Sequence, residues 1–276
     1  MSSASRRKPY RTLAVALAVA ALAGCTIAKP RTDDKWEKFN RKVYAFNDAA
    51  DRAVIRPVAV GYRKVTSPNF RRIVSNFFTN LRMPITMLND ILQGEPKDFL
   101  KSTGRFAVNT TIGVAGFFDP ASQMGLPLSE TDFGVTLAKW GMPEGPYVVV
   151  PLLGSTSVRD LFRFPVDRRV DPLAYYASHQ DLKYNAEYFP QLAFLVTLRS
   201  RGIDAEGLLE GVYDPYVFYR DAYRQRRIYQ IYDGNPPIEV IEQLQGGSED
   251  FDPDALLKEQ EQYNQKNGGG GSTMPR

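Results

Sequence analysis

Proline at the first position of short helices is the feature that most constrains how this chain folds. Aspartate precedes proline four times, and each pair matches a helix N-cap followed by the first helical residue; the aspartates are Asp119, Asp171, Asp214 and Asp252. Proline is tolerated there but breaks a helix from within, so the chain is divided into short segments. Strand-like sequence is confined to residues 147–150, next to a proline. We therefore predict a mainly α fold with about eight short helices.

The predicted helices carry apolar residues at steps of three and four. After a Ser-Pro pair at 67–68, the apolar positions are Phe70, Ile73, Val74, Phe77, Phe78 and Leu81. A similar stripe over residues 39–53 predicts an earlier helix that ends near Pro57. Ser129 to Asp132 is a capping-box variant that begins a further helix, and Gly141 ends that helix. The pattern leaves open whether these apolar faces pack on the protein or contact lipid, because both give the same stripe.

The first 25 residues form a separate unit. Four basic residues precede an apolar run at 13–24, which is too short to span a bilayer but fits the apolar part of an export signal. The run ends in Leu-Ala-Gly followed by Cys25, the only cysteine, and so resembles the lipobox of bacterial lipoproteins. A plain secretory signal with a chance cysteine is the alternative. In the lipobox interpretation Cys25 carries acyl chains that anchor the mature protein, and Thr26 after it resembles an outer-membrane address.

These segments predict a simple domain organisation. We expect a lipoprotein signal peptide at 1–24, an acylated tether at 25–35, one helical domain at 36–245 and a disordered tail at 246–276. The tail is rich in glycine and polar residues, as disordered segments are. Its Gly-rich end is alternatively a remnant of expression cloning.

Few residues are suited to catalysis or to metal binding. Outside the four N-terminal cations the chain has 31 basic and 31 acidic residues, which argues against a nucleic-acid partner. A single cysteine excludes a disulfide framework and a cysteine-based zinc site, and the only histidine, His179, lies in a polar stretch typical of a solvated side chain. No nucleophile elbow, metalloprotease, P-loop or dinucleotide motif occurs. We therefore expect no enzyme activity, no catalytic residue, no metal and no cofactor.

The region near residue 220 is rich in tyrosine and arginine. Four tyrosines are spaced by three or four residues, and we interpret them as a stripe packed on the core rather than at a membrane boundary: Tyr213, Tyr216, Tyr219 and Tyr223. Four arginines accompany them, and we interpret these as a solvated basic helix face, with phosphate headgroups as the alternative partner: Arg220, Arg224, Arg226 and Arg227.

Several segments occur together in a recognisable order. They are found at 39–47, 55–59, 74–81 (VSNFFTNL), 89–94, 105–119 (beginning RFAVNTTIG), 133–137 (FGVTL), 140–148, 152–154, 157–160, 214–216 and 220–223. Each fragment alone is weak, but the ordered set from Trp36 to Arg227 resembles the MlaA (VacJ) family of outer-membrane lipoproteins.

This resemblance implies a specific architecture and role. The fold expected from it is a single helical domain, ring-like around a central amphipathic channel, with a short extended hairpin loop. Such a protein is embedded in the inner leaflet of the outer membrane, faces the periplasm and sits beside a trimeric porin. It extracts mislocalised phospholipids from the outer leaflet, passes them to a soluble periplasmic carrier (MlaC-like), and so maintains lipid asymmetry. A non-catalytic structural lipoprotein that scaffolds a porin or the cell wall, and a lipid hydrolase, are the alternative functions.

The resemblance also places a gating element between residues 141 and 151. In this interpretation Gly141 and Gly145 supply backbone freedom beside the channel, and the valines contact acyl chains. The channel or gating residues expected on this basis are Gly141, Gly145, Pro146, Tyr147, Val148, Val149 and Val150. The alternative is that this loop is an ordinary connection between helices.

Overall fold

The computed structural model describes residues 33–179, 188–209 and 211–246, so the predicted signal peptide, Cys25 and the tail beyond residue 246 lie outside the described residues. Within the described ranges the chain is mainly helical, with a single two-stranded sheet, as predicted. Twelve α-helices occur in those ranges rather than about eight, and three of them, α7, α8 and α9, are only four to seven residues long.

The elements run in the following order. They are α2 (Glu37–Ala50), the π-helical turn η1 (Asp51–Ile55), α3 (Arg56–Val65), α4 (Pro68–Leu81), α5 (Met83–Gln93), α6 (Pro96–Thr111), α7 (Pro120–Gln123), α8 (Phe133–Lys139), β1 (Tyr147–Val150), β2 (Gly154–Ser157), the 3₁₀ turn η2 (Asp160–Phe162), α9 (Arg163–Asp167), α10 (Pro172–His179), α11 (Phe189–Gly202), the 3₁₀ turn η4 (Ile203–Leu209), α12 (Pro215–Ile231) and α13 (Ile238–Gly246).

The predicted helix starts that lie within the described residues are observed in the structure. The Ser67 hydroxyl accepts a hydrogen bond from the Phe70 amide, and Asp119, Asp132 and Asp214 accept from backbone amides two or three residues ahead. Asp171 likewise accepts from the Leu173 amide at the start of α10. Asp252 lies outside the described residues.

The first predicted helix end is wrong. Helix α2 does not stop near Pro57 but continues through η1 into α3. The Arg56 amide bonds to the carbonyl of Asp51, five residues back, instead of four. A proline lacks the amide hydrogen and crowds the carbonyl four residues before it. A helix can therefore continue through a proline where one π-helical turn, with hydrogen bonds to the fifth residue back, relieves this crowding.

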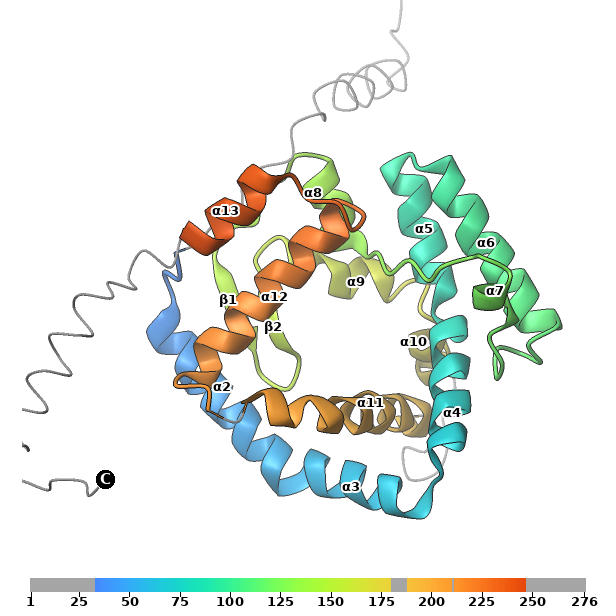
Figure 1. Cartoon of the computed structure of the whole chain (residues 1–276), viewed down its shortest axis with the longest axis horizontal. Helices are drawn as coiled ribbons and strands as arrows, with labels where there is room; N and C mark the ends of the chain where they lie inside the picture. Colours follow the sequence, from blue (N-terminus) through green and yellow to red (C-terminus); the bar gives the residue numbers. More distant parts are fainter. Residues whose placement is uncertain (1–32, 180–187, 210, 247–276) are drawn as a thin grey trace, which may run out of the picture.

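The helices form a ring around a central opening (Figure 1). Contacts join α3 to α11, α11 to α4, α4 to α5, α5 to α8, and α8 to α12. The circuit closes because α12 contacts β2, β1 pairs with β2, and β1 contacts α2. Helices α6 and α7 lie outside the circuit, where α6 packs on α5.

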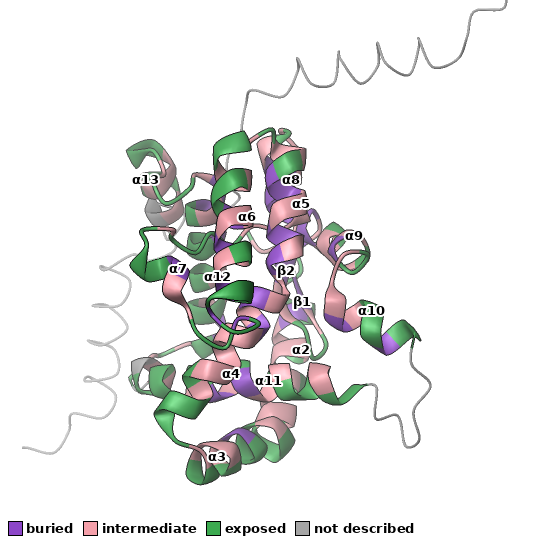
Figure 2. Cartoon of the chain, turned by 90° about the vertical axis from the view of Figure 1, so that its right-hand side faces the viewer, coloured by how far each residue is buried: buried purple, intermediate pink, exposed green. Residues whose placement is uncertain are grey.

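The interior of the protein is unusually polar. Among the described residues, nineteen buried side chains are polar or charged and fifteen are apolar. The buried positions form short bands, notably on α5 and α8, and not one central mass (Figure 2). Many large apolar side chains are exposed instead, on nearly every helix. Because soluble proteins rarely bury this many charged groups or expose large contiguous apolar areas, the fold has its polarity partly inverted.

Candidate functional site

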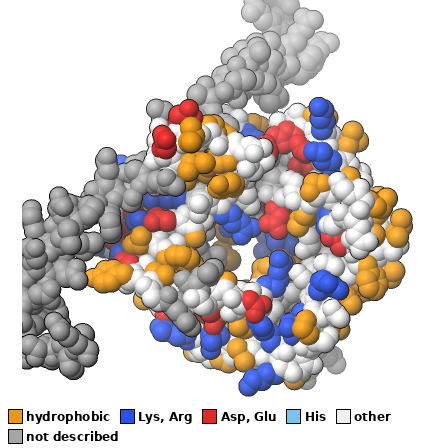
Figure 3. Space-filling view, viewed as in Figure 1, with side chains coloured by type: hydrophobic (Ala, Val, Ile, Leu, Met, Phe, Trp, Pro, Cys, Tyr) orange, Lys and Arg blue, Asp and Glu red, His pale blue; other side chains and the backbone are white. Residues whose placement is uncertain are grey.

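The candidate site is the opening in the middle of the ring. In the space-filling view the centre of the molecule is hollowed, and basic and acidic side chains gather around the hollow (Figure 3). Hydrophobic side chains gather on the outer rim, notably over the end of α6. Helices α4, α9, α11 and α12 and the β hairpin surround the opening (Figure 1). The hollow therefore has a largely polar border inside an apolar perimeter.

Helix α11 shows how individual helices produce this inversion. Its buried side chains are Thr197 and Ser200, each 3% exposed, and both hydroxyls donate to backbone carbonyls within the helix. Leu192 and Leu198 are about half exposed, and Phe189 is more so. Helix α6 repeats the arrangement, with polar side chains inward and Leu100 outward. A helix that buries small polar groups and exposes leucine is typical of protein surrounded by lipid.

The turn after α6 adds to the apolar perimeter. Val114 and Ala115 both adopt left-handed backbone conformations, with φ of 54° and 55°, followed by Gly116 at 87°. A Cβ on Gly116 would lie 2.4 Å from the Cβ of Asn80, so only glycine fits at this close approach to α4. The strained turn holds a set of apolar side chains in solvent-exposed positions: Ile112, Val114, Phe117 and Phe118.

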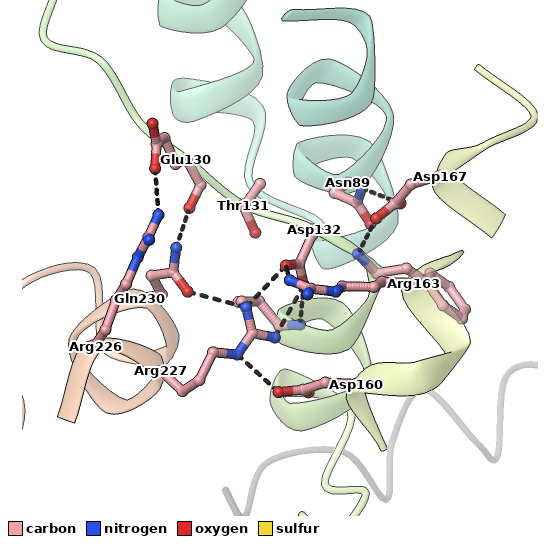
Figure 4. Close-up of polar contacts among 12 residues, drawn as sticks. Asn89, Glu130, Thr131, Asp132, Asp160, Arg163, Asp167, Arg226, Arg227 and Gln230 are labelled. Atoms are coloured by element: carbon pink, nitrogen blue, oxygen red, sulfur yellow. Dashed lines mark hydrogen bonds and ion pairs between the residues drawn. The ribbon is translucent and has the colours of Figure 1, made fainter. Parts of the chain in front are cut away.

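A buried ionic cluster closes the ring on the side of α12 (Figure 4). The Arg227 guanidinium makes two hydrogen bonds to the Asp132 carboxylate, at 2.8 and 2.9 Å, and its Nε lies 2.8 Å from the Asp160 carboxylate. The Tyr223 hydroxyl also donates to Asp160, which is fully buried. A Cβ on Gly134 would lie 2.6 Å from both Arg227 and Asp160, so a glycine allows α8 to pass this close.

The cluster is electrostatically balanced. Burial opposes the charge of Asp132, but the nearby guanidinium of Arg227 and the charge of Arg163 outweigh it and lower the pKa of Asp132 to about 2. Burial likewise opposes the charge of Asp160, and Arg227 and Arg159 lower its pKa below the ordinary value. Both carboxylates are therefore ionised at neutral pH, and they hold α12 against the start of α8 and against η2.

Hydrogen bonds of the Asn89 side-chain amide and the Phe133 backbone amide extend the cluster to α5 and α9. The Asp167 carboxylate accepts from the Asn89 side chain at 3.0 Å and from the Phe133 amide at 3.2 Å. Thr136 donates to the other end of the Asn89 amide at 2.8 Å. Helices α5, α8 and α9 are thus joined by buried polar contacts to the same network that holds α12 (Figure 4).

The interpretation of the α12 arginines as a solvated face is wrong for two of them. Arg224 and Arg227 are buried, whereas Arg226 is exposed and pairs with Glu130 at 2.8 Å. Sequence reasoning missed this cluster, because its acidic partners lie far from α12 in the chain. The tyrosine stripe is also divided: Tyr216 is buried in the core, whereas Tyr213 is fully exposed.

The β hairpin is fixed to α2 by two asparagines one heptad apart. The Asn40 side chain donates to the Tyr147 carbonyl at 3.0 Å and accepts from the Val149 amide at 2.9 Å. The Asn47 side chain likewise donates to the Val150 carbonyl and accepts from the Leu152 amide. The two side-chain amides thus form hydrogen bonds with backbone N–H and C=O groups on the outer edge of the hairpin, where a neighbouring strand would otherwise pair.

The predicted gating residues lie at the base and along the first strand of this hairpin. Gly141 and Gly145 have positive φ, and a Cβ on Gly145 would meet Val158 at 3.1 Å. The Pro146 carbonyl accepts from the Val158 amide. Tyr147 packs with Val149 and Tyr216 in a small core cluster.

One part of that prediction needs correction. Val148 and Val149 were expected to contact acyl chains, but both are buried, because β1 is covered by α2 and α12. Val150 is half-buried. The exposed apolar side chains of the hairpin are Leu152 and Leu153 in its turn, which were outside the predicted set.

Two observations bear on the side chains that could hold a metal ion in the described parts of the chain. His179 is exposed and its ring stacks on Tyr175. Within the described ranges, no three His, Cys, Asp or Glu side chains are close enough to hold a metal ion. Nor does any described helix combine the length and hydrophobicity that crossing a membrane requires.

The fold and its opening define a class of protein: a helical ring with a polar interior, an apolar perimeter and one small hairpin. The chain belongs to the MlaA lipoprotein family, whose family model matches residues 32–230. The Escherichia coli K12 protein named intermembrane phospholipid transport system lipoprotein MlaA is 35% identical over 226 residues, covering 78% of this chain and 86% of that protein. The Haemophilus influenzae protein of the same name is 29% identical, covering 91% and 99%.

A solved structure shares the fold as well as the sequence. It comes from work on the structural basis for maintenance of bacterial outer membrane lipid asymmetry, and it matches with a TM-score of 0.62 at 32% identity. The match covers 74% of this chain and the whole of that chain. The predicted family and the predicted helical fold are therefore confirmed.

Proposed function

We propose that this protein is an outer-membrane lipoprotein that extracts mislocalised phospholipids from the outer leaflet and passes them to a soluble periplasmic carrier. The observation that carries the proposal is the inverted polarity of the ring, with charged side chains around the opening and apolar side chains on the perimeter. A phospholipid has a polar headgroup and apolar chains, so its passage through a monolayer needs both environments together. The relatives named for intermembrane phospholipid transport support this role.

The ring lies within the inner leaflet of the outer membrane and opens to the periplasm. Exposed side chains such as Phe118 and Leu192 give the perimeter the apolar surface that this position requires. Each large apolar side chain that leaves water for lipid contributes about 1.5–3 kcal/mol. The acyl chains on Cys25 add a second attachment, and two signals together give stable anchoring.

The chain is organised to deliver and anchor this ring. Residues 1–24 are the signal peptide, 25–35 the acylated tether, 36–245 the ring domain and 246–276 the C-terminal tail. The protein works without catalysis, metal or cofactor, because passive transfer needs only a path of matched polarity.

The hairpin controls access to the opening. Its base turns at Gly141 and Gly145, and its tip carries Leu152 and Leu153 in exposed positions where an acyl chain can contact them. Pro146, Tyr147 and the three valines up to Val150 give the hairpin a rigid base. A trimeric porin covers part of the apolar perimeter, and an MlaC-like carrier receives lipid at the periplasmic mouth.

Deletion of the gene tests this function. Surface-exposed phospholipid, measured with an impermeant amine-reactive label, is expected to rise in the deleted strain and to return to normal with the gene restored. The purified protein is expected to carry co-isolated phospholipid and to release no fatty acid from it. Unchanged surface phospholipid together with lipid-free protein would favour a scaffold for a porin or the cell wall. Released fatty acid would indicate a hydrolase.

A further inference from the structure

A small polar pocket lies between α4, α6 and the C-terminal end of α11. Its volume is about 120 Å³, and the segment between α7 and α8 completes its wall. The lining includes Ser75, Thr79, Arg105, Asn109, Glu130 and Arg201. Pockets that enclose a whole drug-sized ligand measure roughly 300–1,000 Å³. This pocket therefore has room for a small polar group and not for the acyl chains of a lipid.

Among the residues that line the pocket, Arg201 is the one cation without a carboxylate partner in the described part of the chain. Arg105 is buried and pairs with Asp119 at 2.6 Å, and Glu130 pairs with Arg226 at 2.8 Å. Arg201 donates to the Ser75 hydroxyl at 3.1 Å and forms no ion pair with any described residue. A guanidinium at the wall of a polar pocket is suited to bind a phosphate ester, whose oxygens match its planar set of donors.

Two further polar side chains line the pocket. The Thr79 hydroxyl can donate to the same phosphate ester. Asn80 is 5% exposed, and its Nδ2 donates to Thr110 at 3.0 Å while its Oδ1 accepts no hydrogen bond. A buried carbonyl oxygen without a donor is costly, so a hydroxyl or ammonium group of a ligand would stabilise it.

The pocket adjoins the apolar turn at residues 112–118. Asn76, which also lines the pocket, donates to the Phe117 carbonyl at 3.4 Å, and Gly116 lies directly against Asn80. The exposed side chains of Val114, Phe117 and Phe118 thus begin where the polar pocket ends. A molecule with a polar head and apolar chains fits this junction.

We propose that this pocket binds the phosphodiester headgroup of a phospholipid, with Arg201 and Thr79 on the phosphate oxygens and the acyl chains along the 112–118 turn. The inference rests on the proposed function, since it supplies the headgroup site from which lipid enters or leaves the opening. It also identifies Arg201 as a residue that recognises the phosphate and not the chains.

Direct binding tests the site. The full chain in detergent is titrated by calorimetry with dihexanoyl phosphatidylglycerol, with inorganic phosphate and with dihexanoylglycerol, which lacks the phosphate. Arg201→Gln is expected to weaken binding of the phospholipid about tenfold, since a charge-assisted hydrogen bond is lost. Binding of dihexanoylglycerol is expected to be the same in both proteins. The matched control is Arg72→Gln, an exposed arginine of α4 whose only side-chain hydrogen bond within the described part of the chain is to Asn69.

The outcomes separate the site from the proposed function. Equal phospholipid affinity in wild type and Arg201→Gln would overturn the headgroup site, and so would an equal loss in Arg72→Gln. Binding of inorganic phosphate that depends on Arg201, without binding of the phospholipid, would overturn the lipid assignment. If the wild type shows normal lipid transport in cells while the Arg201 result is negative, only the headgroup site fails. If the deleted strain shows no lipid defect, the proposed function fails whatever the titration gives.

Discussion

The two sides of the ring are held together in opposite ways. On the side of α8 and α12, a small apolar cluster of Val135, Ala138 and Ile231 lies beside the buried contacts of Arg227 with Asp132 and Asp160. On the side of α3 and α11, the charges are partly exposed: Arg199 pairs with Asp51 at 2.8 Å, and Arg56 pairs with Glu206 at 2.8 Å. There the apolar face of α11 points outward.

This difference indicates that the two sides depend on different surroundings. The α12 side satisfies its charges and apolar groups within the protein, so its stability does not require lipid. The α11 side leaves leucines exposed and gains little from partly exposed ion pairs, which contribute about 0–1 kcal/mol each. We therefore expect changes on the α12 side to alter folding and changes on the α11 side to alter membrane association.

The largest effect is expected from removing the central cation of the α12 side. Arg227→Met leaves the carboxylates of Asp132 and Asp160 buried without their main partner, and breaking a buried pair in this way costs about 3–5 kcal/mol. Chemical denaturation in detergent, monitored by tryptophan fluorescence, measures the loss in free energy of unfolding. The neighbouring variant Arg226→Met breaks only an exposed pair with Glu130 and is expected to cost less than about 1 kcal/mol. Equal losses in the two variants would remove the distinction between buried and exposed pairs.

The second effect concerns the outward face of α11. Replacing Leu192 and Leu195 together by glutamine removes exposed apolar surface, and if this face contacts lipid as proposed we expect binding to phospholipid vesicles to weaken about tenfold or more. Vesicle flotation of protein with Cys25 replaced by alanine measures this binding to vesicles without the proposed acyl anchor. The free energy of unfolding in detergent is expected to change little.

The buried face of the same helix provides the control. Thr197→Val changes a side chain that is 3% exposed and donates within the helix. It is expected to leave vesicle binding unchanged. If Thr197→Val weakens vesicle binding as much as the leucine changes do, the orientation of α11 toward lipid is refuted.

A third, more local effect is expected at the contact between α2 and the hairpin. Asn47→Ala removes one of the two hydrogen bonds to the Val150 carbonyl, which keeps the one from the Leu153 amide, and leaves the Leu152 amide without its partner, at a cost of about 1–2 kcal/mol. Hydrogen exchange at the Leu152 amide is expected to become faster, while exchange in α8 stays as in the wild type. Asn69→Ala, which removes a single exposed hydrogen bond to Arg72, serves as the control. Unchanged exchange at Leu152 would show that the strand pairing alone holds the hairpin.

How much of this molecule the sequence predicts depends on the range of each interaction. The helix starts at Ser67, Asp119 and Asp214 follow from side chains that bond to amides two or three residues ahead. The Gly94 end of α5 follows from a left-handed position, with φ of 72°. Such local contacts are present in the sequence pattern itself, which is why the helical segments are predictable.

The site depends on contacts that no local pattern contains. Arg227 meets Asp132 across 95 positions, and Asn40 meets Tyr147 across 107. The apolar stripe of α4 is equally ambiguous, since Phe78 is buried and Phe70 is exposed although both belong to it. Periodicity predicts that a helix has an apolar face, but it does not indicate whether that face meets protein or lipid.

The smallest expected effect compares Asp90 on α5 with the paired carboxylates of the α12 side. Asp90 is 1% exposed and forms no ion pair with a described residue, and its Oδ2 has no hydrogen-bond donor within those ranges. Burial raises the pKa of Asp90 to about 6, whereas the pKa of Asp132 is about 2. The pKa of an unfolded aspartate is about 3.9. The two carboxylates should therefore give opposite dependences of stability on pH.

Between pH 7 and pH 5 the folded protein takes up a proton at Asp90 and the unfolded chain does not, so the free energy of unfolding should rise by about 1 kcal/mol as the pH falls. Asp132 is ionised in both states over that range and adds no slope; its contribution is lost only below the unfolded value, as the pH falls toward 2. Asp90→Asn mimics the protonated carboxyl and is expected to reduce the rise from pH 7 to pH 5 by about 1 kcal/mol. Chemical denaturation of the wild type and the variant at pH 7 and at pH 5 measures this change in the free energy of unfolding. A rise of the same size in the variant would assign the proton to another group and would mean that Asp90 stays ionised at both pH values.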